Sequence, residues 1–164
     1  MNRNVFIVIL IIFNIAIDQI TKVIVRANIE LREVKEIIGD KFILTNVYNE
    51  GAFLGMGSDM NQTLKTIFLA ILPVLVLGYV IYYIIKNRDL DRLSLIAFCC
   101  IIGGGIANVF DRIVFGKVTD FFFIDLGGIF KTGIFNVADM SVTAGMIMLL
   151  FSSFFNKKKQ VDTE

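Results

Sequence analysis

Two aspartates in the second half of the chain could carry hydrolytic chemistry. Asp120 ends a polar insertion, residues 116–120, that precedes the aromatic run 121–123, and Asp139 lies at the start of a long apolar segment. The loop between them is short enough to fold back, so both carboxylates are expected at the same surface. Two adjacent carboxyl groups do not both ionise easily, so one keeps its proton while the other acts as a base. Such a pair can activate water and protonate a leaving amine without histidine or metal.

The composition excludes other hydrolytic centres. The sequence contains no histidine, which rules out a Ser-His-Asp triad, a Cys-His pair and a His-ligated metal site. Its two cysteines, Cys99 and Cys100, are adjacent inside an apolar run and are interpreted as small packing residues. The net charge is only +1, so there is no basic footprint for nucleic acid. No metal, cofactor or nucleic-acid partner is expected.

Each aspartate also has an ordinary structural interpretation. A carboxylate in the first turn of a helix is favoured by the helix dipole, so Asp139 could simply cap its helix. Asp120 could be a solvated loop residue beside an interfacial belt of aromatic side chains. Only the two together favour catalysis.

Two further polar pairs lie at membrane depth, where ionisable residues are suspected of function. Asp18 and Lys22 are four residues apart, so they share a helical face and can form an ion pair; we assign them a supporting role. Asn108 and Arg112 have the same spacing and follow glycines 103–105, whose small size lets helices approach closely. This second pair could position a carboxylate or a substrate carbonyl. The alternative is helix packing with an arginine that reaches the interface.

Four membrane-spanning helices must carry these residues. The chain is 56% apolar with a mean hydropathy of +0.75, and the apolar residues occur in blocks. A bilayer core of about 30 Å needs roughly 20 helical residues. Four segments qualify, at about residues 5–25, 67–85, 93–110 and 135–155. The first is expected to be an uncleaved anchor, because no small-residue cleavage site follows it. We predict a membrane α-helical fold, with residues 1–164 forming one integral membrane domain.

The basic residues predict the orientation of these spans. Seven Lys and Arg residues lie in the short segments at residue 3, residues 86–92 and residues 157–159. Seven more are spread over the longer segments 26–63 and 111–133, where acids outnumber them. Because cytoplasmic loops are rich in Lys and Arg, both termini are predicted to be cytoplasmic and the larger loops to face outward.

The first outer loop, about residues 27–63, is predicted to be rich in β-structure. Residues 42–48 are mostly β-branched and aromatic, as strands are, and residues 49–51 are typical of a turn. We therefore expect a small extracytoplasmic β-cradle on the outer membrane face.

Five motifs, spread in order over nearly the whole chain, resemble those of one family, the lipoprotein signal peptidases, also called signal peptidase II. Residues 18–22 (DQITK) are similar to the family's D-Q-x-[TS]-K, and residues 49–53 (NEGAF) to its N-x-G-A. Residues 103–112 (GGGIANVFDR) resemble G-G-A-x-G-N-x-x-D-R. Residues 118–121 (VTDF) resemble V-x-D-F, and residues 135–139 (FNVAD) resemble F-N-x-A-D.

The resemblance implies an aspartic peptidase of the bacterial cytoplasmic membrane, active at the outer face, with Asp120 and Asp139 as its catalytic dyad. The implied substrate is a prolipoprotein whose cysteine already carries diacylglycerol, cleaved on the amino side of that cysteine. Globomycin-type compounds are the expected inhibitors, membrane lipid is the surrounding partner, and a monomer is expected. The remaining implied residues line or support the site: Asn49, Gly51, Asn108, Arg112, Asn136, Asp18 and Lys22.

The chain departs from the family pattern in three places. Ala107 stands where a glycine is usual, but alanine is small enough for close packing. Residues 53–55 (FLG) differ from the usual loop, which leaves the alignment of Phe53 open. Gly133 and Ile134 replace the usual proline before the last motif, which is expected to loosen the approach to Asp139.

Two other functions fit parts of the pattern. A small ion or proton carrier could use Asp18, Lys22 and Asp139 as relay groups, although the charges gather at one face and no inverted repeat is visible. A non-catalytic scaffold could instead bind lipidated peptides through its glycine-packed helices.

Overall fold

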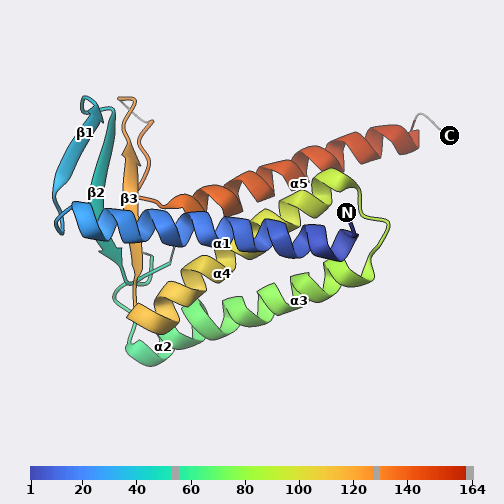
Figure 1. Cartoon of the computed structure of the whole chain (residues 1–164), viewed down its shortest axis with the longest axis horizontal. Coiled ribbons are helices and arrows are strands. Elements are labelled where there is room, and N and C mark those ends of the chain that lie inside the picture. The colour runs from blue at the N-terminus through green and yellow to red at the C-terminus, as the bar shows by residue number, and fades with distance from the viewer. Residues whose placement is uncertain (53–55, 128–129, 162–164) are drawn as a thin grey trace.

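The computed structural model describes residues 1–52, 56–127 and 130–161, with side chains described as far as residue 154. Its four long helical segments are each long and apolar enough to cross a membrane, which confirms the predicted fold class. They are α1 (Arg3–Asn28), the composite α2–η2–α3 (Gln62–Thr66, Ile67–Ile71 and Leu72–Lys86), α4 (Arg92–Phe115) and α5 (Val137–Val161). The three-stranded sheet lies at one end of the bundle, and the N-terminus, the end of α5 and the α3–α4 turn lie at the other (Figure 1).

Helix α4 is the centre of the bundle. Half of its apolar window is buried, against 17% for each of the other three segments. Its three glycines explain this position, because each faces a different helix. A Cβ atom on Gly103 would lie 2.6 Å from Asn14 of α1, and one on Gly105 would lie 2.7 Å from Leu77 of α3. A Cβ on Gly104 would collide with the backbone oxygen of Ala138 in α5. The predicted close approach at residues 103–105 is therefore observed on three sides.

The outer faces of the surrounding helices are apolar and exposed. Large side chains such as Phe13 (59%), Leu75 (65%) and Phe151 (56%) are more than half accessible. A bundle that leaves such residues uncovered is suited to lipid rather than to water. The chain is thus a multi-pass membrane protein.

The regular α-helix of the second span is interrupted just before Pro73. A proline lacks the backbone N–H that an α-helix needs, and its ring crowds the carbonyl of the residue four positions earlier. The π-turn Ile67–Ile71 precedes it, and α3 then begins at Leu72, with proline in its first turn. The widened turn accommodates the proline while the helical path continues to Lys86.

The sheet consists of β1 (Val34–Ile38), β2 (Phe42–Asn49) and β3 (Val118–Ile124), all antiparallel, in the order β1-β2-β3. The strand predicted at 42–48 is confirmed as β2. The polar insertion around Asp120 is not a loop, however, because Asp120 lies within β3, opposite Val47 of β2. This strand was not predicted because its sequence shows no alternation of polar and apolar side chains; its first four residues are all buried and its last three are half-buried.

The sheet is attached to the bundle by a small apolar core. Val25 and Ile29 at the end of α1 pack with Phe121 of β3, which is 1% exposed. Phe135 then pairs with Phe122 through hydrogen bonds in both directions, of 2.8 and 2.9 Å. The segment before α5 is thereby tied to β3, so helix α5 begins at Val137, slightly later than the predicted span at 135. This contact brings the start of α5 next to the strand that carries Asp120.

Candidate active site

Asp120 lies on strand β3, and the side-chain amides of two asparagines hold its carboxylate. Its side chain is 3% exposed. Its Oδ2 accepts a hydrogen bond of 2.9 Å from Asn49 Nδ2, and its Oδ1 accepts one of 2.6 Å from Asn136 Nδ2. Both carboxylate oxygens are thus fixed in direction by side chains that precede and follow β3 in the chain.

Asp139 is held by the start of helix α5. Asn136 precedes the helix, and its Oδ1 accepts a 2.9 Å hydrogen bond from the backbone N–H of Asp139. In return, Asp139 Oδ2 accepts a 3.1 Å hydrogen bond from the backbone N–H of Asn136. This reciprocal arrangement is a capping box, which uses two N–H groups that a helix start otherwise leaves unpaired. Asp139 therefore does cap its helix, as its ordinary interpretation has it, and the same bonds fix where its carboxylate points.

Asn136 joins the two carboxyl groups. Its side-chain amide donates to Asp120 while its backbone N–H donates to Asp139, so one buried residue contacts both acids. Asn108 of α4 completes the bridge: its Nδ2 donates to Asp139 Oδ1 at 2.9 Å, and its Oδ1 accepts from Asn136 Nδ2 at 3.2 Å. The two acids thus share one amide network.

Burial and the neighbouring acid change the protonation of Asp120. Removal from water raises the pKa of this carboxyl to about 6, and the negative charge of Asp139 adds to the increase. The hydrogen bonds from Asn49 and Asn136 act in the opposite direction but do not cancel it. Asp120 therefore holds its proton at pH values where an ordinary aspartate is fully ionised.

Beneath this network lies a buried lysine. Lys22 Nζ is 2.8 Å from Asp18 Oδ2, 2.8 Å from Asp111 Oδ2 and 2.8 Å from Asn108 Oδ1. The three charged side chains are fully buried. The predicted pairing of Asp18 with Lys22 is observed, and Asp18 also accepts a 2.8 Å hydrogen bond from the backbone N–H of Ala138. Because Lys22 donates to the oxygen of Asn108, the amide nitrogen of Asn108 is left facing Asp139.

The loop after β2 is fixed to the same site by Asn49 and Arg112. Asn49 Oδ1 accepts a 2.9 Å hydrogen bond from the backbone N–H of Gly51, which forms the predicted turn. Arg112 Nη2 donates at 2.8 Å to the carbonyl of Gly51, and its Nη1 donates at 3.3 Å to the carbonyl of Asn108. Arg112 thus faces the site rather than the membrane interface.

Cavities reach the two acids from different directions. Asp120 borders a cavity of about 430 Å³ beside the sheet, together with Asn49. Asp139 borders a cavity of about 400 Å³ between η2, α3, α4 and α5, and another of about 540 Å³ along the outer side of α5. The walls of these two are mainly apolar and include Phe68, Pro73, Val142, Met146, Phe135 and Ile147. The paired acids therefore lie where the cavity beside the sheet meets more strongly apolar grooves along the helices.

The sequence interpretation missed two residues of the buried network. Asp111 is fully buried beside Lys22, and Gln19 Nε2 donates to Asp111 Oδ1 at 2.9 Å. A signal was present, because Asp111 is three residues after Asn108 and so lies on the same face of the helix. Across the described residues, no cluster of three or more metal-ligating side chains is placed to hold an ion.

Comparison with known proteins identifies the family. The family model described as signal peptidase (SPase) II matches residues 10–155. The chain belongs to the signal peptidase II family. Among its relatives, the lipoprotein signal peptidase of Brevibacillus brevis is 39% identical over 145 residues, covering 88% of this chain and 92% of the relative. That of Psychromonas ingrahamii is 35% identical over 144 residues, covering 88% and 82%.

Solved structures of bacterial membrane enzymes are also similar to this signal peptidase II chain. One, determined by the in meso method at 2.3 Å, superposes with a TM-score of 0.83 at 25% identity, covering 94% of this chain and 90% of the other. A second, at 1.9 Å, has a TM-score of 0.77 at 26% identity, covering 90% and 91%. The fold of four helices and a small sheet is therefore that of membrane enzymes.

The departures from the signal peptidase II pattern leave the described network in place. Ala107 is fully buried, so its methyl group is accommodated in the packed centre of α4. Gly133 and Ile134, which stand in place of the usual proline, lead into the pairing of Phe135 with β3. Residues 53–55 lie outside the described part of the chain.

Proposed function

We propose that this signal peptidase II removes signal peptides from prolipoproteins with Asp120 and Asp139 as its catalytic dyad. The observation that carries the proposal is the placement of both carboxyl groups on Asn136, one on its side-chain amide and the other on its backbone N–H. Family membership supports the substrate class, because the relatives are named lipoprotein signal peptidases.

The two acids have different environments, which suggests a division of roles. Asp139 lies in the first turn of α5, where the helix dipole favours a negative charge. Asp120 lies on a strand with a raised pKa of about 6, so it is the better proton carrier. In our proposal, Asp139 is the ionised base and Asp120 is the protonated acid.

The reaction then needs only water and these two groups. Asp139 takes a proton from a water molecule as the water oxygen bonds to the scissile carbonyl carbon. Asp120 gives its proton to the peptide nitrogen as the carbon–nitrogen bond breaks, releasing a carboxylic acid and an amine. The proton gained by Asp139 and the one lost by Asp120 balance, so the dyad is restored when one proton moves between them.

The apolar grooves beside Asp139 suit a substrate that stays in the membrane. A diacylglyceryl-modified cysteine could keep its acyl chains in lipid while the peptide bond on its amino side enters the polar site. We propose that Arg112, which already donates to the carbonyl of Gly51, helps to hold substrate carbonyls in an extended conformation. Globomycin-type inhibitors are expected to compete for the same grooves.

The proposed orientation places the sheet and the dyad at the outer face of the cytoplasmic membrane. The end away from the sheet carries Arg3 and the basic turn of residues 86–92, which supports a cytoplasmic location for that end. The prolipoprotein would then meet the dyad on the side to which it is exported.

A cleavage assay tests the dyad. Asp120→Asn and Asp139→Asn, each assayed on a diacylglyceryl-modified precursor, are expected to lower kcat by at least about a hundredfold, because each removes one proton-transfer step. Asp125→Asn is the matched control, since Asp125 is an acid one residue beyond β3 that pairs with exposed Lys131 at 3.1 Å. Normal turnover by either dyad variant would contradict the proposal, and so would an equal loss in the control.

A further inference from the structure

Another cavity, lined by both charged and apolar side chains, lies at the end of the bundle opposite the sheet. Its volume is about 430 Å³, and three arginines line it: Arg3 of α1, Arg88 of the α3–α4 turn and Arg92 of α4. The apolar part of its wall includes Phe6, Leu90 and Leu95. None of these residues belongs to the proposed catalytic site.

Two of the three arginines are held in place. Arg3 Nη2 donates at 2.8 Å to the carbonyl of Ile84 and at 2.9 Å to that of Asn87, at the end of α3. The guanidinium of Arg92 lies over the ring of Phe6, 5.9 Å from its centre. Groups that are positioned before a ligand arrives lose little freedom when they bind it.

The positive charges of the cavity are not neutralised by ion pairs. No ion pair in the described part of the chain involves Arg3, Arg88 or Arg92. The nearby carboxylate of Asp91 instead accepts hydrogen bonds from Ser94 and from Ser152 of α5, which do not line the cavity. Three guanidinium groups around one cavity therefore present donors for an anion.

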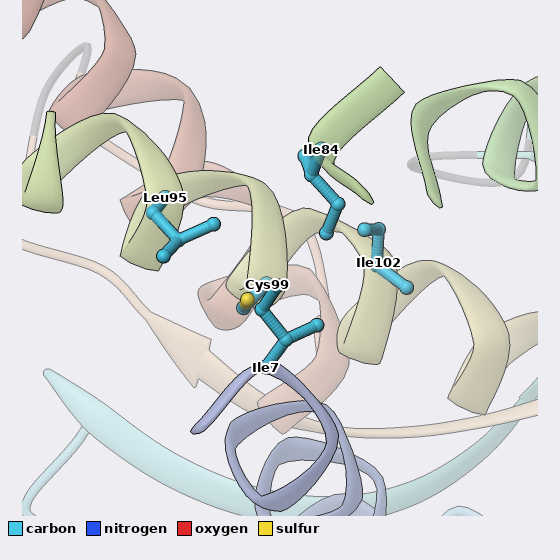
Figure 2. Close-up of a cluster of buried hydrophobic side chains, with 5 residues drawn as sticks. All are labelled: Ile7, Ile84, Leu95, Cys99 and Ile102. Carbon is cyan, nitrogen blue, oxygen red and sulfur yellow. The ribbon is translucent and has the colours of Figure 1, made fainter. Parts of the chain in front are cut away.

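The position of the cavity indicates the kind of anion. Leu95 is buried in the apolar core of α1, α3 and α4 that Figure 2 shows, together with Ile7, Ile84 and Ile102. At the same ends of their helices, Val5 of α1 and Ile85 of α3 are 48% and 49% exposed, as lipid-facing residues are. The arginines thus lie at the ends of spans, where lipid head groups meet the bilayer core.

We propose that this cavity binds the phosphate of an anionic phospholipid, with the acyl chains lying along the exposed faces of α1 and α3. The bound lipid would fix the depth and angle of the bundle in the cytoplasmic leaflet, far from the dyad. The site goes beyond the proposed peptidase activity and does not depend on it.

The test measures lipid retention by the full chain in detergent micelles that contain equal amounts of phosphatidylglycerol and phosphatidylcholine. Native mass spectrometry gives the affinity for the first bound molecule of each lipid. Arg88→Gln/Arg92→Gln changes two exposed residues, so folding is checked by circular dichroism and is expected to be retained. Lys86→Gln is the matched control, because Lys86 is an exposed cation at the same end that does not line the cavity.

The double variant is expected to bind phosphatidylglycerol at least about tenfold more weakly, because it loses hydrogen bonds to a charged group. Phosphatidylcholine binding and the control should change by less than about threefold, since an exposed charge is screened. An unchanged preference in the double variant, or an equal loss in Lys86→Gln, would overturn the proposal. Displacement of the lipid by inorganic phosphate would overturn it too, because the cavity would then select a free anion.

Discussion

Replacement of Lys22 is expected to destabilise this protein strongly, because its ammonium group is paired with two buried carboxylates. Each of its contacts with Asp18 and Asp111 is 2.8 Å long, and all three side chains are fully buried. At an effective dielectric constant of about 20, a charge pair at that distance is worth about 6 kcal/mol before the cost of removing the ions from water. That cost is several kcal/mol for each ion, so the net value of the triad is much smaller than the sum of its two attractions.

The consequence of removing only the lysine follows from this balance. Lys22→Met keeps most of the length of the side chain but leaves Asp18 and Asp111 buried and facing each other without a cation. Breaking a buried pair in this way costs about 3–5 kcal/mol, because the remaining charge has no compensation. Asn108 Oδ1 also loses one of its two hydrogen bonds and keeps only the 3.2 Å bond from Asn136, so its amide is held less firmly toward Asp139.

Equilibrium unfolding in detergent micelles, followed by circular dichroism, measures this loss. Lys35→Met is the matched control, because Lys35 pairs with Glu33 at 3.6 Å with both side chains well exposed (44% and 38%). The control is expected to change the free energy of unfolding by less than about 1 kcal/mol. Adding Asp18→Asn and Asp111→Asn to Lys22→Met removes the uncompensated charges and should recover at least half of the lost stability.

Two results would refute this reasoning. If Lys22→Met unfolds like the unaltered protein, the triad contributes no net stability. If the triple variant is no more stable than Lys22→Met alone, the loss comes from packing around the lysine chain and not from charge.

Two further predictions concern the dyad and the packing of α4. Asn49→Ala removes a hydrogen bond that favours ionised Asp120, so the pKa of Asp120 should rise further above about 6. Asp120 acts while protonated, so a higher pKa keeps the enzyme active to a higher pH. In a plot of kcat/KM against pH, the decline on the basic side should therefore move up by roughly one pH unit. A decline that stays in place or moves down would contradict this. Gly104→Ala should lower the free energy of unfolding by about 1–3 kcal/mol, because its methyl group collides with the Ala138 carbonyl. Gly78→Ala, at a helical glycine with open space around it, should be neutral or stabilising in the same equilibrium unfolding experiment, and equal losses would refute the packing argument.

Much of the helical framework was predictable from local sequence. Length and hydropathy identified the four helical segments, because one apolar segment of about 20 residues suffices to cross a bilayer. The pairing of Asp18 with Lys22 followed from their four-residue spacing, since neighbours on a helix face need no knowledge of the rest of the fold. The glycines at 103–105 likewise indicated close helix contacts before any partner helix was known.

The partners of these elements were not predictable in the same way. Strand β3 is recognisable only through its pairing with β2, so the sequence interpretation placed Asp120 in a polar insertion and predicted no strand there. The ion pair of Asp111 with Lys22 exists only because α1 packs against α4, which brings together residues far apart in the chain. Such contacts depend on which faces meet, and local periodicity does not specify that.

The sequence by itself determined which groups are available: Asp120 and Asp139, a lysine with a nearby acid, several amides and no histidine. Tertiary structure alone decided that Asn136 contacts both Asp120 and Asp139, because this requires β3 and the start of α5 to be joined through Phe122 and Phe135. The physical reason is the distance along the chain over which each property is defined. Residue type and helical spacing are local properties, whereas a shared hydrogen bond between a strand and a helix start exists only once the chain has folded.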